Sequence, residues 1–597
     1  MSKFEFNKIN VRAIFNLTNT GYLRKWLTVS VLVGIVAGLA SILFYLAIQY
    51  CTQLFLGFGA GYFPPTSGGE VSQTVASGPL RIWAIPIITT LGGLISGLIV
   101  YKWAPEAEGH GTDAAINAFH NKDGFIRRRV PIIKIIASAI TIGSGGSAGR
   151  EGPVALVGAG FGSAIADVFK LSNRDRRIAL AIGIGAGIGS IFKSPLGGAL
   201  LSTAILYRRD FEVYALLPSF ISSIVGYTIF ASWAGWDPIF TIGSGLVYHR
   251  SQELLGYIVL GVACGLFGTL YGRSFYWIRD LFKKLRIPNY FKPALGGLLV
   301  GMIGIFLPQV MGSGYGWMQY AIDGNYTALP ILIMLGLIFA KIAATGFSIG
   351  SGGSGGVFAP GLFIGGMVGG IVWYILHSSA SVAQFIPATP AAFVIVGMMG
   401  LFGGIAKAPL PIMIMVSEMT GSYFLLAPCM VTVFITYFMT RGSYIYEHQV
   451  DSRSHSPAHR SEYTVPLLKK ITIGEIMQRP VATISPEESL ATLADLMKEK
   501  KVDAVPVLEG RYLVGIIANL DLVRISESKW QEIAVRDVMI KKLVVGYSYE
   551  LLFEALTRMN ENNISHLPII QKNHPGVLVG FITLNDITSS YTLPSDI

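Results

Sequence analysis

The chain carries little charge for its length. Of 597 residues, only 14% are Asp, Glu, Lys or Arg, whereas 52% are hydrophobic. This composition is far more apolar than that of an average soluble protein, which excludes an ordinary soluble domain. Uncharged apolar stretches such as 28–50 and 82–101 reach the roughly 20 residues that a membrane-spanning helix needs. We therefore expect a multi-pass integral membrane protein.

Cysteine is also scarce. The three cysteines are far apart and lie in or beside apolar stretches, so we expect neither a disulfide framework nor a metal site from Cys51, Cys264 and Cys429. The sequence contains no Gly-x-x-x-x-Gly-Lys-Ser/Thr phosphate loop, which argues against an ATP-driven pump. It also lacks a basic stripe with interleaved aromatic residues. The net charge of +11 therefore indicates contact with anionic membrane lipid rather than with nucleic acid.

Basic residues precede the first apolar stretch, and no short apolar region with a small-residue cleavage site is found there. We therefore expect no removable signal peptide. Positive charge before a first span favours a cytoplasmic N-terminus, in the cell (inner) membrane. The basic residues concerned are Lys3, Lys8, Arg12, Arg24 and Lys25.

Glycine, in contrast, is abundant, with 70 copies, and a glycine-rich phrase of twelve residues occurs twice. The copies are Ile142-Gly-Ser-Gly-Gly-Ser-Ala-Gly-Arg-Glu-Gly-Pro153 and Ile349-Gly-Ser-Gly-Gly-Ser-Gly-Gly-Val-Phe-Ala-Pro360, with prolines 207 residues apart (360 − 153). Proline is tolerated in the first turn of a helix, so each phrase predicts an irregular segment that leads into a helix N-terminus. Such an end offers unpaired N–H groups to an anion, and irregular backbone at membrane depth lines a cavity. Two such breaks predict an anion site built from two half-helices.

Charged residues inside the apolar body are costly in lipid and mark candidate functional positions. Glu151 is the strongest candidate because it lies within the first phrase, where a helix end would hold a carboxylate as readily as a halide. Protonation would release the carboxylate and give a gate that responds to pH. A structural pair with Arg150 or Lys134 is the alternative. The other such charges are Asp167, Lys193, Lys341, Lys407 and Glu418.

Three segments carry a resemblance to a known family: Pro105-Glu-Ala-Glu-Gly-His-Gly111, Gly149-Arg-Glu-Gly-Pro153 and Gly356-Val-Phe-Ala-Pro360. Together they resemble the CLC family of chloride channels and proton-coupled chloride exchangers. The resemblance implies an all-α polytopic membrane domain with inverted repeats, one chloride pathway per subunit and a homodimer. The sequence shows no cluster of metal-ligating residues, so we expect no metal. Because fluoride-exporting members typically lose the arginine that is Arg150 here, it also favours chloride.

The resemblance assigns roles residue by residue. Glu151 matches the gating glutamate, and its neighbours Gly149, Arg150 and Gly152 complete the motif around the anion. The backbone amides that hold the central anion match Val357 and Phe358. A tyrosine hydroxyl that binds the same anion matches Tyr446, with Tyr444 as the alternative.

Two departures from the family pattern bear on the mechanism. His110 replaces a serine whose hydroxyl contacts the anion, so it either supplies a ring N–H or a titratable charge, or it turns away. Ile205 stands about ten residues after Pro195, where exchangers have a proton-carrying glutamate. Isoleucine carries no proton, so we expect passive chloride conduction. A chloride/proton antiporter with an atypical internal proton path is the alternative, and a membrane enzyme using Glu151 with His110 as an acid–base pair is a remote one.

The tail after the membrane body contains its own repeat. Ile473-Gly-Glu-Ile-Met477 corresponds to Val535-Arg-Asp-Val-Met539, and helix and strand signals alternate in each copy. This resembles a tandem pair of CBS domains with an α/β fold, which in other members often binds adenine nucleotides such as ATP. The resemblance points to Thr583, Asp586 and Asp521, although Ala518 replaces the hydroxyl in the first unit. Nucleotide binding and a purely structural, dimerising role are both open.

These features predict four regions. The cytoplasmic N-terminal segment covers residues 1–25, and the anion-pathway domain covers 26–447. A linker over 448–470 leads to the CBS pair, which covers 471–597. The two CBS units cover about 471–528 and 533–590.

Overall fold

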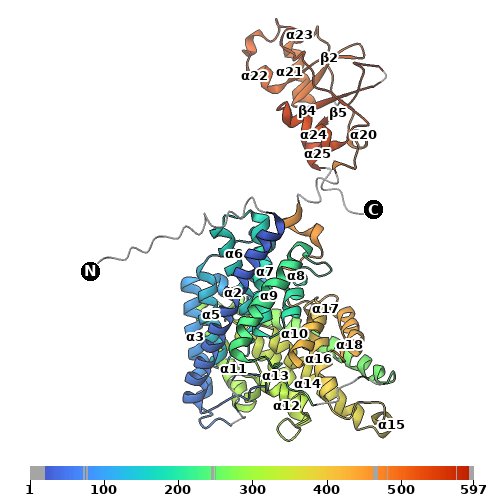
Figure 1. The fold of residues 1–597 in the computed structure, drawn as a ribbon. Helices are drawn as coiled ribbons and strands as arrows, with labels where there is room; N and C mark the ends of the chain where they lie inside the picture. The colour runs from blue at the N-terminus through green and yellow to red at the C-terminus, as the bar shows by residue number, and fades with distance from the viewer. Residues whose placement is uncertain are drawn as a thin grey trace, which may run out of the picture. The chain divides into compact units, whose positions relative to one another are not determined.

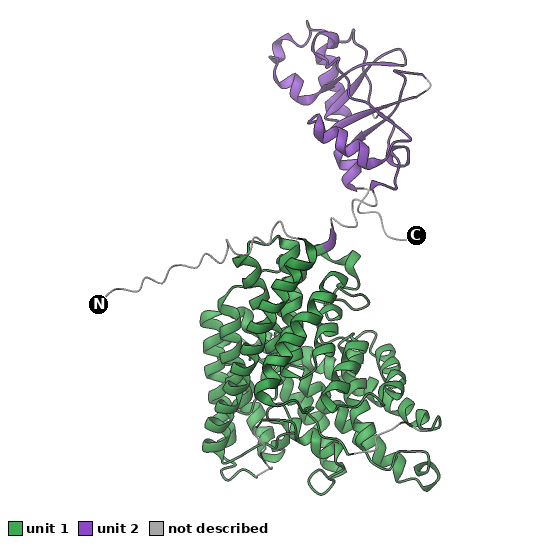
Figure 2. Cartoon of the chain, in the orientation of Figure 1, with its two compact units in different colours: residues 1–458 green, residues 459–597 purple. Residues whose placement is uncertain are grey.

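The computed structural model describes residues 21–71, 74, 78–243, 248, 250–460, 468–480, 482–572 and 574–589. The chain divides into two compact units, Met1–Ala458 and His459–Ile597 (Figure 2). Most of the predicted N-terminal segment 1–25 lies outside the described residues, as do residues 461–467 of the predicted linker.

The first unit is a helical membrane domain (Figure 1). Within the described residues, seven helices are long and apolar enough to cross a bilayer, and shorter apolar helices accompany them. The helices of its first half are α2 (Tyr22–Thr52), α3 (Ala84–Trp103), α4 (Thr112–Asn121), α5 (Arg129–Gly143), α6 (Glu151–Val168), α7 (Asn173–Ile191), α8 (Pro195–Ala204) and α9 (Val213–Ala234). Those of its second half are α10 (Glu253–Lys284), α11 (Lys292–Phe306), α12 (Tyr315–Ile322), α13 (Ile331–Thr345), α14 (Phe358–His377), α15 (Ala380–Ala383), α16 (Ala391–Ile405), α17 (Pro409–Thr420) and α18 (Leu426–Met439).

The two halves of this unit are inverted repeats. Helices α6 and α14 begin at equivalent positions of the two glycine-rich phrases. Just before them, Gly149 and Gly356 exchange hydrogen bonds, each amide donating to the other's carbonyl at 2.7 Å. Reciprocal pairing of equivalent residues is what a local two-fold axis produces, so such an axis passes between these glycines. The two helix N-termini therefore face each other across it.

Two Gly-x-Gly loops repeat in the same way. Gly109 and Gly111 precede α4 with φ of 71° and 83°, and Gly312 and Gly314 precede α12 with φ of 62° and 84°. These left-handed conformations favour glycine because a Cβ atom would be strained there. The two-fold axis places the two loops on opposite sides of the helix N-termini.

Glycine also brings helices close together in the core. A Cβ atom on Gly158 of α6 would lie 2.1 Å from the carbonyl oxygen of Gly183 of α7, and the reverse holds as well. In lipid, close packing of this kind has to replace the hydrophobic effect as the force between helices. The buried α6–α7 pair thus supplies a rigid support for the residue at the start of α6, Glu151.

The second unit contains two similar α/β subdomains. The antiparallel strands β1 (Ala504–Glu509) and β2 (Tyr512–Ala518) form one sheet, and β3 (Gly546–Tyr547), β4 (His566–Ile570) and β5 (Leu578–Thr583) form the other, with β3 parallel to β4. Helices α21 and α24 pack on these sheets, each over its own apolar core. The helices are α20 (Ile473–Ile476), α21 (Leu490–Lys500), α22 (Asn519–Val523), α23 (Val535–Val538), α24 (Leu552–Glu561) and α25 (Leu584–Ser589).

Candidate anion site

The carboxylate of Glu151 lies where the two halves of the membrane unit meet. Its Oε2 accepts a hydrogen bond from the amide of Ala359, in the first turn of α14, at 3.3 Å. Its Oε1 accepts one from the hydroxyl of Tyr315, at the start of α12. Glu151 is only 2% exposed. A carboxylate thus occupies the N-terminal end of a membrane helix, a position that suits any anion.

The loop with His110 packs directly against the start of α6. A Cβ atom on Gly152 would lie 1.9 Å from the carbonyl oxygen of His110, so only glycine fits. The His110 ring lies 5.5 Å from the ring of Tyr446, and the amide of Asp113 approaches its Nδ1 at 3.5 Å. Tyr446 is 1% exposed and lies beside the hydroxyl of Thr112. The sequence-predicted residues of the first half and Tyr446 are therefore neighbours.

The predicted amides of the second half lie in the same region. Phe358 begins α14, and its ring packs between those of Phe192 and Phe402, at 4.9 and 4.4 Å. The carbonyl of Val357 accepts a hydrogen bond from the hydroxyl of Tyr271 at 2.8 Å. This bond occupies the carbonyl of the residue that precedes the helix.

Tyr444, the alternative to Tyr446, has other surroundings. The guanidinium of Arg208 lies over its ring at 4.3 Å. Its ring is thus engaged by a cation, whereas Tyr446 lies beside His110.

A buried lysine lies behind each Gly-x-Gly loop. Lys134 donates to the carbonyls of Ala107 and Gly109, at 2.9 and 2.7 Å. Its equivalent, Lys341, donates to the carbonyls of Val310 and Gly312, both at 2.9 Å. Both side chains are fully buried. Each loop therefore has a buried ammonium group bound to its carbonyl oxygens, and this charge makes the region attractive to anions.

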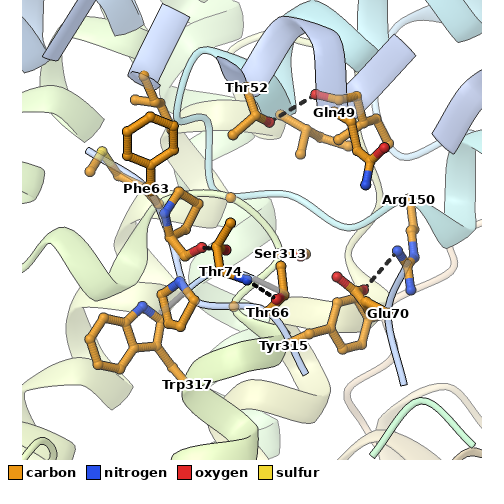
Figure 3. Close-up of a pocket in the computed structure, with 18 of the residues that line it drawn as sticks. Gln49, Thr52, Phe63, Thr66, Glu70, Thr74, Arg150, Ser313, Tyr315 and Trp317 are labelled. Carbon is orange, nitrogen blue, oxygen red and sulfur yellow. Dashed lines mark hydrogen bonds and ion pairs between the residues drawn. The ribbon is translucent and has the colours of Figure 1, made fainter. Parts of the chain in front are cut away.

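One cavity opens on the Tyr315 side of Glu151, and we call it the Arg150 cavity. It is lined by Arg150, Glu70, Tyr315 and the loop that precedes Tyr315 (Figure 3). Arg150 forms an ion pair with Glu70 at 2.9 Å, so its charge is balanced by that carboxylate and not by Glu151 alone. The guanidinium also stacks on the rings of Tyr45 and Tyr315, at 5.2 and 4.7 Å.

A second cavity, the His110 cavity, lies at the other Gly-x-Gly loop. It is lined by His110, Asp113 and His448, among others, and by several basic side chains. Asp113 contacts His448 through both the amide and the imidazole of that residue. The hydrogen bond from this carboxylate raises the pKa of His448, which lies beyond the last helix of the membrane unit. The basic residues lining the cavity are Lys122, Arg127, Arg279 and Lys283.

The other charges of the apolar body have structural partners. Lys193 and Lys407 follow the C-terminal ends of α7 and α16 in a left-handed conformation, and both donate to backbone carbonyls. Asp167 pairs with Arg176 at 2.9 Å. Glu418 caps the start of α8, accepting from Ser194 Oγ at 2.5 Å and from the amides of Leu196 and Gly197 at 3.2 and 2.8 Å.

Ile205 is buried at the end of α8, and its carbonyl accepts a hydrogen bond from Gln449 at 2.9 Å. An aliphatic side chain therefore fills the position at which the resemblance would place a proton carrier. In the second unit, Asp586 accepts from the amide and hydroxyl of Thr583, at 2.8 and 2.7 Å, and Asp521 accepts from the amide of Ala518 at 2.9 Å. Within the described residues, no group of three or more His, Cys, Asp and Glu is arranged to hold a metal ion.

Sequence reasoning missed Tyr315 and Glu70. A signal for Tyr315 exists in retrospect, because Gly312-Ser-Gly-Tyr315 repeats the pattern of Gly109-His-Gly-Thr112. No comparable signal points to Glu70, whose partner Arg150 lies 80 residues further along the chain (150 − 70).

Known proteins resemble this chain over most of its length. A putative chloride channel protein ClcB-like of Ralstonia nicotianae is 29% identical over 390 residues, covering 64% of this chain and 88% of its own. An H(+)/Cl(-) exchange transporter ClcA of Vibrio parahaemolyticus is 27% identical, covering 68% of this chain and 84% of its own. The structure of a slow cyanobacterial Cl-/H+ antiporter superposes with a TM-score of 0.61 at 23% identity, covering 70% of this chain and 94% of its own.

Family sequence models cover both units. The model described as voltage gated chloride channel matches residues 92–441, well over half of the chain, and the CBS domain model matches residues 473–528 and 535–592. The inverted helical repeats and the α/β tail agree with these matches. The chain therefore belongs to the CLC family of voltage-gated chloride channels and related anion transporters, and it carries a tandem pair of CBS domains.

Proposed function

We propose that this protein conducts chloride passively across the membrane and that the carboxylate of Glu151 is its protonatable gate. The observation that carries the proposal is the place of that carboxylate, hydrogen-bonded to the amide of Ala359 at the N-terminus of α14. A halide would use the same donor, so the charged carboxylate competes with it. Protonation removes the negative charge and frees the position for chloride.

The path runs from the His110 cavity, past His110, Phe358 and Tyr446, to Glu151 and the Arg150 cavity. Helix-end amides bind a halide weakly enough for release, which conduction requires. The buried charges of Lys134 and Lys341 support anion over cation passage, because each lies behind a loop that borders one of the cavities.

Passive conduction is supported by Ile205, which cannot relay a proton. Proton-coupled exchange is the second candidate, because several similar proteins are named as H(+)/Cl(-) exchangers. The titratable pair Asp113 and His448 in the His110 cavity offers an alternative to a glutamate at position 205.

Assembly and regulation complete the proposal. The protein forms a homodimer in the cell (inner) membrane, with its N-terminus and CBS domains in the cytoplasm. The CBS pair binds an adenine nucleotide such as ATP through Thr583 and Asp586, with Asp521 at the equivalent place of the first unit. The mutual hydrogen bonds of Thr583 and Asp586 support this by holding both side chains at the start of α25.

The deciding experiment reconstitutes the full-length protein in planar bilayers or liposomes. Under opposed chloride and proton gradients, a reversal potential set by chloride alone supports passive conduction, and a shift with the proton gradient supports exchange. Chloride flux should rise as pH falls, and Glu151→Gln should conduct at all pH values. Glu418→Gln is the matched control, a second carboxylate of the membrane unit outside the pathway. A pH profile that persists in Glu151→Gln would refute the gate.

A further inference from the structure

The hydroxyl of Tyr315 contacts the proposed gate directly. It donates to Oε1 of Glu151, while the Ala359 amide donates to Oε2, so the two oxygens are held from opposite halves of the repeat. Tyr315 is 3% exposed and stands between the carboxylate and the Arg150 cavity. The hydrogen bond to the carboxylate therefore comes from the side that faces this cavity.

The Tyr315 ring is itself held in place. The guanidinium of Arg150 stacks on it at 4.7 Å, and the ring of Phe240 packs against it at 5.8 Å. Arg150 is fixed in turn by its ion pair with Glu70, as Figure 3 shows. A hydroxyl on so restrained a ring loses little freedom when it forms its hydrogen bond, which makes the bond more effective.

The inverted repeat gives this tyrosine a counterpart. Tyr315 ends the loop equivalent to Gly109–Thr112, and Thr112 lies beside the hydroxyl of Tyr446. A tyrosine hydroxyl therefore lies at each Gly-x-Gly loop: Tyr446 lies beside His110 and Thr112 of the first loop, and Tyr315 ends the second loop at the Arg150 cavity.

We infer that Tyr315 is the latch of the gate: its hydroxyl holds the charged Glu151 carboxylate in the closed position. The inference rests on the proposed gating role of Glu151 and adds a positioning residue to it. A phenol donates more strongly to a carboxylate than to a neutral carboxyl group, so protonation weakens the bond at the same time as it removes the charge. Loss of the negative charge and weakening of the Tyr315 hydrogen bond therefore occur together, when Glu151 is protonated.

Other groups act on the Glu151 carboxylate through their charge or dipole. Arg150 adjoins it in the chain, Lys341 faces it from α13, Tyr271 from α10 and Tyr446 from the segment after α18. All of them are present in both the wild type and a Tyr315→Phe variant. The variant therefore isolates the hydrogen bond, because it keeps the ring that Arg150 stacks on.

The experiment measures chloride flux against pH in proteoliposomes for wild type, Tyr315→Phe and Tyr62→Phe. Tyr62→Phe is the matched control, a buried tyrosine whose hydroxyl donates instead to the carbonyl of Pro308. A hydrogen bond to a charged acceptor typically changes an equilibrium by about tenfold or more. Tyr315→Phe should therefore open at a pH about one unit higher than wild type, and Tyr62→Phe at the wild-type pH.

Two further variants separate the latch from the gate and from folding. In a Glu151→Gln background, Tyr315→Phe should leave flux unchanged, since the charged acceptor is gone. Incorporating 3-fluorotyrosine at position 315, a stronger donor in the same space, should move opening to lower pH. An unchanged opening pH in Tyr315→Phe, with pH dependence lost in Glu151→Gln, would overturn the latch and leave the gate standing. Persistent pH dependence in Glu151→Gln would overturn both.

Discussion

Replacing Gly152 by alanine tests the packing that joins the His110 loop to the start of α6. The new Cβ would lie 1.9 Å from the His110 carbonyl oxygen and 3.1 Å from the Cα of Gly356. Cβ atoms essentially never approach other atoms closer than 3.0 Å, so the oxygen has to retreat by at least 1.1 Å (3.0 − 1.9). The loop resists this movement, because its Gly109 carbonyl is bound to Lys134 at 2.7 Å.

The cost follows from these contacts. Overpacking of this kind lowers the free energy of unfolding by about 1–3 kcal/mol, whereas the better helix propensity of alanine raises it by about 0.5–1 kcal/mol. We expect the free energy of unfolding of Gly152→Ala to fall by about 1–2 kcal/mol. Chloride flux should fall more, by at least about tenfold, because the loop would no longer place a donor on the anion, and one donor to a charged partner is worth about 1.5–3 kcal/mol.

Gly336→Ala is the matched control, since it lies within α13 and a Cβ there would meet nothing within 4 Å. Its flux should equal that of wild type, and its stability should be equal or slightly higher. Thermal unfolding in detergent and chloride efflux from liposomes measure the two quantities. Wild-type flux and unfolding temperature in Gly152→Ala would show that the close approach of His110 to α6 is wrong.

Two further predictions concern the buried cap and the CBS pair. Glu418→Ala removes three hydrogen bonds at the start of α8. The free energy of unfolding of this variant should fall by about 3 kcal/mol in a denaturation experiment, and its anion selectivity should be unchanged. Altered selectivity would place Glu418 in the pathway. Thr583→Ala reproduces the residue of the first CBS unit, Ala518, and should weaken ATP binding to the full-length protein about tenfold in equilibrium dialysis. Equal binding by both proteins would contradict a role for the Thr583 hydroxyl.

Much of the fold follows from local sequence features. The apolar stretch predicted at 28–50 lies within α2, and the stretch at 82–101 coincides with α3 to within two residues at each end. The two prolines at 153 and 360 each stand third in a helix, as a residue tolerated only in the first turn should. These features depend on length, hydropathy and backbone chemistry over a few residues, which is why sequence alone contains them.

The partners of the charged groups were not predictable in the same way. The sequence suggested Arg150 or Lys134 as a structural partner of Glu151, but Arg150 pairs with Glu70 and Lys134 binds backbone carbonyls. The hydroxyl bound to Glu151 comes from Tyr315, 164 residues away in the other half of the repeat. Such contacts depend on where the two-fold axis lies, and hydrophobic periodicity carries no information about it.

In the proposed function, the lysines allow peptide groups to attract an anion without a fixed cation at the site. A loop at membrane depth exposes carbonyl oxygens as well as N–H groups, and the oxygens repel a halide. Lys134 donates hydrogen bonds to the carbonyl oxygens of Ala107 and Gly109, and Lys341 donates to those of Val310 and Gly312. With its oxygens bound to an ammonium group, each loop has a net positive field. The charge then acts through the backbone, so it favours anions without forming the direct ion pair that would hold chloride too tightly for conduction.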